Sequence, residues 1–316
     1  MRKRPASQLD LSDLFLTAAP TNEFLERLEA LVDWQPLERE LAAMFTAPTG
    51  RLPKPPLVVF KMLLLSHCYG LSDPQCEELV RDRLSWRRFV GLNLVDAVPD
   101  ETTLVRFRQR MVEHGLHERL LGLLNEQLLA RGLILKQVTL VDATLVAAAR
   151  RAPRRDEPSG GDPQAGHTVQ HGKTHYGYKA HLAVDAQHTL IRRADLSAAS
   201  VHDSQRFEAV VTGDEKTVTA DKAYASAARA AWLAARGIRN GILRRAWKQR
   251  PLNAAGRRWN RRWSRIRCGI EKIFGHWKRS LGYRRVRYVG HEPNRLELEF
   301  KCVVWNFKRW VNLANV

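Results

Sequence analysis

Three acidic residues of this 316-residue chain lie in surroundings that do not favour an acid. Asp142 interrupts an apolar, β-branched run, Asp221 ends a second short run, and Glu271 is the only acid between Asp221 and Glu292. A carboxylate within an apolar strand is costly to bury unless it is paired or binds a cation. Carboxylates hold Mg²⁺ well, and two such ions activate the attacking oxygen and stabilise the leaving oxygen in phosphodiester cleavage. The three acids therefore indicate metal-dependent chemistry on a phosphate ester.

Glu271 lies in a strongly basic stretch. Residues 244–287 contain sixteen Lys and Arg residues, and Glu271 is their only acid. One interpretation is a surface helix in which Glu271 relieves charge repulsion by an i, i+4 pair with Arg267. The other is a surface that binds a polyanion, with the acid holding a metal ion against it. This stretch alone leaves both interpretations open.

The composition favours a nucleic-acid partner. The net charge is +19, with a pI near 10.4, and 44% of the residues are hydrophobic. A globular protein this basic is expected to bind an acidic partner, of which nucleic acid is the first candidate. The most apolar run, 57–65, contains Lys61 and is too short to cross a bilayer. We therefore expect neither a secreted nor a membrane-inserted protein.

The cysteines and histidines raise the question of zinc. The four cysteines show no C-x-x-C spacing, which favours reduced thiols in a cytosolic protein. Six histidines lie between 167 and 202, so a zinc site is conceivable. They lack a helical or C-x-x-C context, and histidines on loops or strand surfaces are the more common outcome.

The N-terminal part has a helical pattern. Apolar residues recur at three- and four-residue spacing from 21 to 135, and prolines punctuate the pattern. A helix over about 102–114 carries Arg106, Arg108 and Arg110. These arginines indicate either a solvated helix face or a helix-turn-helix-like contact with DNA.

The pattern changes at Lys136 to one typical of an α/β fold. A strand is predicted over 138–146, a flexible loop over 150–173, and a hairpin from 176 to 196. Beyond the hairpin we predict, in order, a helix from about 203 to 212, a strand at 218–220, a helix over 226–236, a strand over 238–243, and helices over 257–281 and 295–313. The sheet therefore has mixed strand directions.

The basic helix over 257–281 has two distinct faces. Its apolar stripe is expected to pack on the sheet; it comprises Trp259, Trp263, Ile266, Ile270, Phe274, Trp277 and Leu281. Spacings of three, four and seven residues place Ser264, Arg267, Glu271 and Lys278 on a neighbouring face.

These motifs resemble those of the DDE transposases of bacterial insertion sequences, most nearly the insertion-sequence-five family, which is related to the insertion-sequence-four group. The matching segments are LVDATLV around Asp142, HYGYKAHLAVD from His175, His202-Asp203-Ser204, TADKAYAS around Asp221, and R-x-x-x-E-x-x-x-x-x-x-K from Arg267. The related pattern often has a Tyr three residues before the Arg, where this chain has Ser264. The region from Pro55 to Leu116 resembles the family's N-terminal domain.

The resemblance implies an RNase H-like core, with a mixed five-stranded sheet flanked by helices, and an all-helical N-terminal domain. Residues 1–135 would form that domain and bind DNA ends; residues 136–290 would form the catalytic core, including the loop 150–173 and the basic segment 244–258. Residues 291–316 would form a C-terminal helix packed on the core. Asp142, Asp221 and Glu271 would be catalytic and would bind two Mg²⁺ or Mn²⁺ ions.

The resemblance also implies a function and partners. The enzyme would bind the terminal inverted repeats of its element, cut the DNA, and transfer the freed 3′ hydroxyl to target DNA. It would bind double-stranded DNA as a homodimer in the bacterial cytoplasm, associated with the nucleoid. Together with the basic composition, it predicts DNA contacts at Arg267, Lys278, Arg257, Arg258, Arg261, Arg262, Arg284 and Arg285. The alternatives are an RNase H-like nuclease or resolvase and a catalytically silent DNA-binding protein.

Overall fold

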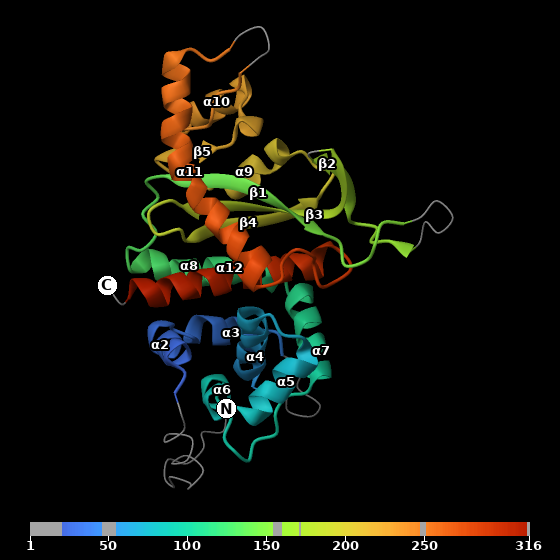
Figure 1. The fold of residues 1–316 in the computed structure, drawn as a ribbon. Coiled ribbons are helices and arrows are strands. Elements are labelled where there is room, and N and C mark those ends of the chain that lie inside the picture. Colours follow the sequence, from blue (N-terminus) through green and yellow to red (C-terminus); the bar gives the residue numbers. More distant parts are fainter. Residues whose placement is uncertain (1–20, 46–54, 154–159, 171, 247–250, 315–316) are drawn as a thin grey trace. The chain divides into compact units, whose positions relative to one another are not determined.

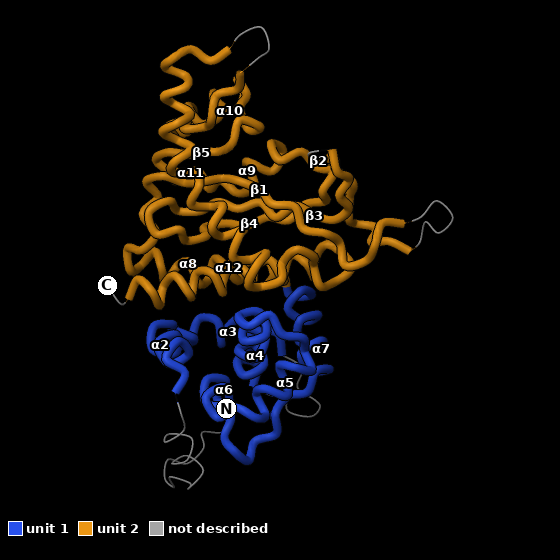
Figure 2. Tube along the Cα trace, viewed as in Figure 1, with its two compact units in different colours: residues 1–114 blue, residues 115–316 orange. Residues whose placement is uncertain are grey.

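The computed structural model describes residues 21–45, 55–153, 160–170, 172–246 and 251–314. The chain divides into two compact units, residues 1–114 and residues 115–316 (Figure 2). Each unit is described by itself.

The described part of the first unit is helical, as predicted. Its helices are α2 (Glu23–Leu31), α3 (Gln35–Ala43), α4 (Pro56–Tyr69), α5 (Asp73–Asp82), α6 (Leu84–Val90) and α7 (Glu101–Glu113). Helix α4 is its centre, because every residue from Val58 to Cys68 is buried. Proline at its first position is pre-set for a helix, and Gly70 ends it at a φ of 72°, which glycine adopts without a steric penalty.

The second unit is built on a mixed sheet (Figure 1). Strand β1 (Thr139–Ala147) is antiparallel to β3 (Lys173–Asp185), which is antiparallel to β4 (Ile191–Ala198). On its other side β1 is parallel to β5 (Thr217–Ala220), and β5 is parallel to β6 (Arg239–Asn240). This order, with three antiparallel strands followed by two parallel ones, confirms the predicted RNase H-like core.

A sixth strand extends the sheet beyond the predicted five. Strand β2 (Gly166–Gln170) pairs antiparallel with the first half of β3, inside the segment 150–173 that we expected to be a loop. Its polar sequence shows no apolar alternation, so pairing with β3 rather than local pattern orders it. Gly172, with a φ of 74°, fits the tight hairpin turn that follows. Residues 154–159 and 171 lie outside the described residues.

Two further strand predictions needed correction. The hairpin strands were expected at 176–184 and 189–196, but β3 already begins at Lys173 and β4 begins at Ile191. The last strand was expected over 238–243, but β6 comprises only Arg239 and Asn240, although the N–H groups of Gly241 and Leu243 also donate to carbonyl oxygens of β5.

Two groups of helices pack against different strands of the sheet. Helix α8 (Leu120–Ala130), the 3₁₀ turn η1 (Leu116–Glu118) and α12 (His291–Leu313) pack together, with α8 and α12 against β4. The long helix α11 (Ala254–Ser280) crosses β1 and β5 (Figure 1). The short elements η3 (Asp203–Arg206), α9 (Phe207–Val210), η4 (Lys222–Tyr224) and α10 (Ala227–Ala234) complete the unit.

The division between the units falls before the expected domain end at residue 135. Residues 115–135 group with the second unit because α8 is tied into its core. Asn125 Nδ2 donates to the carbonyl oxygens of Ile191 and Arg192, both at 3.0 Å. Glu299 of α12 accepts from the Leu121 N–H at 2.8 Å. These buried hydrogen bonds make α8 part of the sheet-bearing unit.

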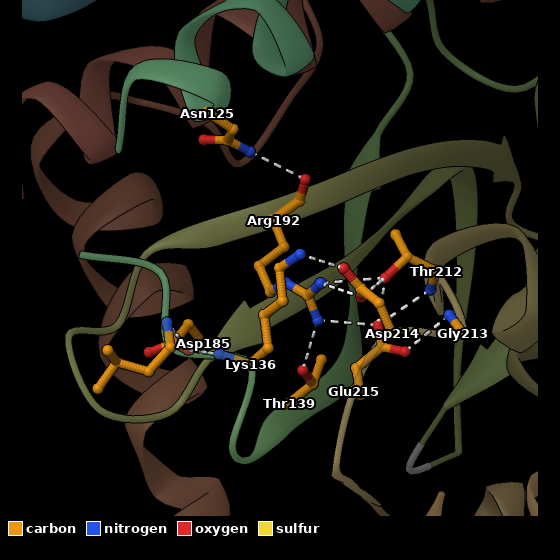
Figure 3. A network of polar contacts seen from close by, with 10 residues as sticks. Asn125, Lys136, Thr139, Asp185, Arg192, Thr212, Gly213, Asp214 and Glu215 are labelled. Carbon is orange, nitrogen blue, oxygen red and sulfur yellow. Dashed lines mark hydrogen bonds and ion pairs between the residues drawn. The ribbon is translucent and has the colours of Figure 1, made fainter. Parts of the chain in front are cut away.

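A polar network around Arg192 holds the beginning of β1 in place (Figure 3). Its guanidinium donates to Thr139 Oγ1 and to Glu215 Oε1, both at 2.9 Å. Lys136, just before β1, has a φ of 58°, which is uncommon for a residue with a side chain. Its N–H donates to Asp185 Oδ2 at 3.0 Å, and its Nζ lies 2.5 Å from Asp214 Oδ2. The network therefore fixes the entry of the strand that carries Asp142.

Candidate active site

Asp142 lies within β1, next to the point where the parallel strand β5 ends and Asp221 follows. Val141 of β1 is paired with Ala220 of β5, and the next residue of each strand is the acid. Asp221 directly follows β5, at the start of η4. The carboxyl ends of parallel strands form one edge of a sheet, which is where α/β folds place their ligands. The sheet thus brings together two acids that are separated by 78 residues in the sequence.

Strand alternation turns Asp142 toward α11. Leu140, two residues earlier, faces Gly269 of this helix, where an added Cβ would lie 3.4 Å from the Leu140 side chain. Val141 points the other way, into a core cluster that includes Phe207 and Tyr224. Because successive side chains of a strand point to opposite faces, Asp142 shares the α11 face with Leu140.

Arg267 of α11 joins Asp142 to Glu271. Its Nη1 lies 2.5 Å from Asp142 Oδ2 and its Nη2 lies 2.8 Å from Glu271 Oε1. The i, i+4 pair between Arg267 and Glu271 that was considered from the sequence is therefore present, and Arg267 also pairs with Asp142 of β1. Asp142 and Arg267 are largely covered, whereas the Glu271 side chain is 57% exposed.

The acids are of the residue type that binds divalent cations, but the described side chains do not converge on one point. Burial raises the pKa of Asp142 to about 6 against the opposing effect of Arg267, and the charges of Asp221 and Asp203 raise it further. The ionised carboxylate therefore lacks full compensation, and a positively charged guanidinium already lies between two of the three acids. Among the described residues, no three His, Cys, Asp or Glu side chains are arranged to hold a metal ion together. Glu271 is turned to Arg267 in this arrangement.

Helix α11 positions Arg267 and Glu271 through its buried stripe. Asn253 caps its first turn by accepting from the Gly256 N–H at 2.7 Å. Five of the seven predicted stripe residues are buried: Trp263, Ile270, Phe274, Trp277 and Leu281. Ile273 is buried as well, whereas Trp259 and Ile266 are half-buried. The apolar stripe thus fixes which side of the helix meets β1, and the functional face follows from it.

The other predicted basic residues lie along and just after α11. Six of the arginines are exposed: Arg257, Arg258, Arg261, Arg262, Arg284 and Arg285. Lys278 is half-buried, and burial, together with the nearby charge of Arg284, lowers its pKa. Arg284 Nε donates to the Lys278 carbonyl oxygen at 3.1 Å. Lys278 and Arg284 line a cavity of about 310 Å³ with the ends of β1 and β3.

Arg108 is a structural residue in the first unit. It is 9% exposed, and its two Nη atoms lie 2.8 and 2.5 Å from the Asp73 carboxylate oxygens. Arg110 lies over the Phe45 ring, and Arg106 is exposed. The three arginines of α7 therefore do not form one free cationic face.

Sequence reasoning assigned no catalytic role to three residues near the acids. Asp203 and Tyr224 lie close enough to Asp142 for their charges to affect one another, and Lys179 is paired with Asp203. The motifs that contain Asp203 and Tyr224 were noted as part of the family resemblance. Spacing alone could not show which of their side chains face the site.

None of the described helices is both long and apolar enough to cross a membrane.

The order and directions of the strands define an RNase H-like fold. A family model described as "Transposase DDE domain" matches residues 134–307, and a second, "Transposase domain (DUF772)", matches residues 15–110. Because the first covers more than half of the chain, the chain belongs to the DDE transposase family and is a DNA transposase. The family depends on divalent metal ions.

Solved transposase structures are similar to this chain at low identity. A cryo-EM structure of the piggyBac transposase synaptic complex with hairpin DNA matches at 10% identity, with a TM-score of 0.44, covering 96% of this chain and 76% of the other. The crystal structure of the Mos1 strand transfer complex matches at 11% identity with a TM-score of 0.21, covering 77% of this chain and 82% of the other.

Proposed function

We propose that this enzyme is the transposase of an insertion sequence similar to the insertion-sequence-five family. It binds the terminal inverted repeats of its element, cuts the DNA there, and transfers the freed 3′ hydroxyl to target DNA. The two matched transposase domains and the net charge of +19 support this assignment.

Asp142, Asp221 and Glu271 are the proposed catalytic acids, and they hold two Mg²⁺ or Mn²⁺ ions. The observation that carries this proposal is the bridge from Asp142 through Arg267 to Glu271, beside the strand end that leads to Asp221. Bound ions would supply Lewis-acid stabilisation of the attacking and leaving oxygens. Arg267 holds the acids together until its guanidinium turns to a DNA phosphate, for which its fork of donors is well suited.

The exposed arginines of the basic stretch are the proposed contacts with double-stranded DNA. Their exposure supports backbone neutralisation. Lys278 would bind a phosphate near the cut, two helical turns beyond Glu271 on the same side of α11. The helical first unit, which ends at residue 114, would bind the DNA ends, and the sheet-bearing unit from residue 115 on would form the catalytic core, with α12 packed on it. The enzyme would act as a homodimer on paired ends, associated with the nucleoid in the bacterial cytoplasm.

Cleavage of DNA that carries the element's ends tests the catalytic assignment. We expect Asp142→Asn, Asp221→Asn and Glu271→Gln each to lower the Mg²⁺-dependent cleavage rate by about 10³-fold or more, because several kcal/mol of transition-state stabilisation depends on the ions they hold. DNA affinity measured without metal should stay near that of the wild type. Full cleavage by one variant would remove that residue from the site.

Strand-transfer products distinguish a transposase from a nuclease or resolvase with the same core. A wild-type protein that cuts the ends but never joins them to target DNA would favour the nuclease. Sedimentation of the protein–DNA complex tests the dimer, because one protein bound to two ends would contradict it.

A further inference from the structure

The second half of β1 has an unpaired outer edge. Strand β5 pairs with β1 only up to Val141. The chain after α11 reaches the same edge at Ala147, whose N–H donates to the Arg284 carbonyl oxygen and whose carbonyl oxygen accepts from the Val286 N–H, both at 2.9 Å. Because backbone groups alternate in direction along an antiparallel strand, the Leu145 N–H points to this edge as well. It has no hydrogen-bond partner among the described residues.

A cavity of about 310 Å³ lies at this edge. Its lining includes residues 145–147 of β1, Lys278 of α11 and Arg284. The β2–β3 hairpin contributes Gln170 and His175. None of the described residues that line the cavity is acidic. The cavity therefore combines two cations with neutral hydrogen-bond donors.

Lys278 and Arg284 are held close together by the fold. Arg284 Nε donates to the Lys278 carbonyl oxygen at 3.1 Å, and Tyr283 and Val286 on either side of the arginines are buried. Burial and the charge of Arg284 lower the pKa of Lys278. Two like charges in a partly buried place are unfavourable unless an anion compensates them. The cavity is thus prepared for an anion that the described residues do not supply.

The β2–β3 hairpin extends beyond the neighbouring strands. Residues 173–176 of β3 pair with β2, whereas the pairing of β3 with β1 ends at Gly177 and that with β4 at Tyr178. Gln170 and His175 are exposed there, and their side chains make no hydrogen bond to other described residues. Amide and imidazole N–H groups are therefore available to a ligand in the cavity.

We propose that this cavity binds one phosphate of the DNA backbone, close to the phosphate that is cut. Lys278 and Arg284 neutralise its charge. The Leu145 N–H donates to one of its oxygens, and Gln170 and His175 donate from the hairpin. Basic side chains, amides and backbone N–H groups are the usual donors to DNA phosphates. This inference rests on the proposed function, because it starts from the proposed DNA contacts of Lys278 and Arg284 and adds the hairpin and the edge of β1.

The cavity is too far from the acids to hold the phosphate that is cut. Lys278 follows Glu271 by seven residues on α11, and Leu145 follows Asp142 by three on β1. Each separation corresponds to about 10 Å along its element. DNA advances by roughly 3.4 Å per nucleotide of one strand, so the bound phosphate lies a few nucleotides from the cut. The cavity thus positions the DNA strand and takes no part in the chemical step.

A binding cycle that combines protein variants with single neutral phosphates tests the inference. Duplex DNA that carries the element's ends is made with one methylphosphonate, which removes one charge, at successive positions near the cut. Without metal, we expect Lys278→Met to weaken binding by about 10- to 100-fold, and Gln170→Ala and His175→Ala by about 3- to 10-fold. At one position the methylphosphonate should weaken binding by the wild type much more than binding by these variants.

Thr174→Ala and Arg279→Met are the matched controls. Thr174 is exposed next to His175, and Arg279 is exposed next to Lys278, but neither lines the cavity. Neither change should alter the effect of the methylphosphonate at that position. Circular dichroism and unfolding midpoints establish that each variant is folded.

The outcomes separate this inference from the proposed function. If Gln170→Ala and His175→Ala bind DNA as Thr174→Ala does, the inference is wrong, while the DNA contacts of Lys278 and Arg284 stand. Losses that are the same for every methylphosphonate position would also overturn it, because they would reflect overall charge alone. If Lys278→Met and Arg284→Met both bind as the wild type does, the proposed DNA contacts of these two residues fail as well.

Discussion

Arg192 and Arg267 each join two carboxylates, but the two networks differ in how completely they are closed. Arg192 and Glu215 are buried, with side chains 6% and 0% exposed, and Thr139 and Thr212 add further hydrogen bonds (Figure 3). Its two acids, Asp214 and Glu215, lie in a single turn. Asp214 is 42% exposed, but its carboxylate is bonded by Lys136 and Thr212 as well as by Arg192, so several donors share each acid of this network.

The Arg267 network differs in where its acids come from and in how exposed they are. Its acids come from different elements, β1 and α11, and Glu271 is mostly exposed. The Arg267 Nε is buried without a partner among the described residues. The exposed acid of the Arg192 network, Asp214, is also bonded to Lys136 and Thr212, so we expect another cation to replace Arg267 more readily than Arg192. We therefore expect the Arg192 network to contribute to stability and the Arg267 network to exchange its arginine for another cation.

Removing Arg192 should have the largest effect on stability. Arg192→Met leaves Glu215 buried without its cation, so we expect the free energy of unfolding to fall by about 3 to 5 kcal/mol. Denaturant unfolding followed by circular dichroism measures this change. Arg193→Met, at the exposed next position of β4, is the matched control and should change it by no more than about 0.5 kcal/mol. An Arg192 variant as stable as the control would show that the buried network is not required.

Glu299 is a buried acid outside such an arginine network. Replacing it should change the free energy of unfolding by less than Arg192→Met does, and by an amount that depends on pH. Burial raises the pKa of Glu299 to about 7, because the Leu121 N–H and the charges of Arg295 and Arg193 only partly offset the loss of solvation. The folded protein therefore binds this proton more tightly than the unfolded chain does. Stability from this group is complete below about pH 4.5 and is lost as the pH rises through 7.

Glu299→Gln should remove this loss of stability at higher pH. Relative to the wild type, the variant should gain stability between pH 4.5 and 7 and level off above it, at a gain of at most about 3 kcal/mol. Unfolding free energies measured from pH 4.5 to 8 test this. Glu126→Gln, on the exposed side of α8, should follow the wild-type profile. A constant difference at all pH values would mean that Glu299 is not protonated in the folded protein near neutral pH.

The sequence predicted those features that depend on local pattern. Apolar spacing predicted the buried stripe of α11, and an acid inside an apolar strand drew attention to Asp142. The RNase H-like order of strands came from the family resemblance rather than from the pattern itself. Strand β2 was not predicted, because its residues are mostly polar and show no strand pattern of their own. Pairing with β3 orders them.

The partners of the site residues could not be predicted for a related reason. The i, i+4 rule gave the contact between Arg267 and Glu271, but the contact with Asp142 spans 125 residues. Likewise, Lys179 and Asp203 meet only because β3 and η3 converge beside β1. Periodicity shows which face a side chain occupies, whereas tertiary packing decides which residue it faces.

Removing Arg267 should have the smallest effect on stability and should thereby sharpen the comparison with Arg192. Arg267→Met leaves the largely covered Asp142 without its cation but strands no fully buried charge, so the free energy of unfolding should fall by about 1 to 2 kcal/mol, less than in Arg192→Met. Mn²⁺ binding measured without DNA should become tighter, since the carboxylates no longer have a competing cation, while affinity for DNA should fall with the loss of a phosphate contact. Arg265→Met, at an exposed position two residues earlier, should leave Mn²⁺ affinity unchanged. If Arg267→Met instead destabilised the protein as much as Arg192→Met, both arginines would serve the fold, and an exchangeable cation at Asp142 would be the wrong interpretation.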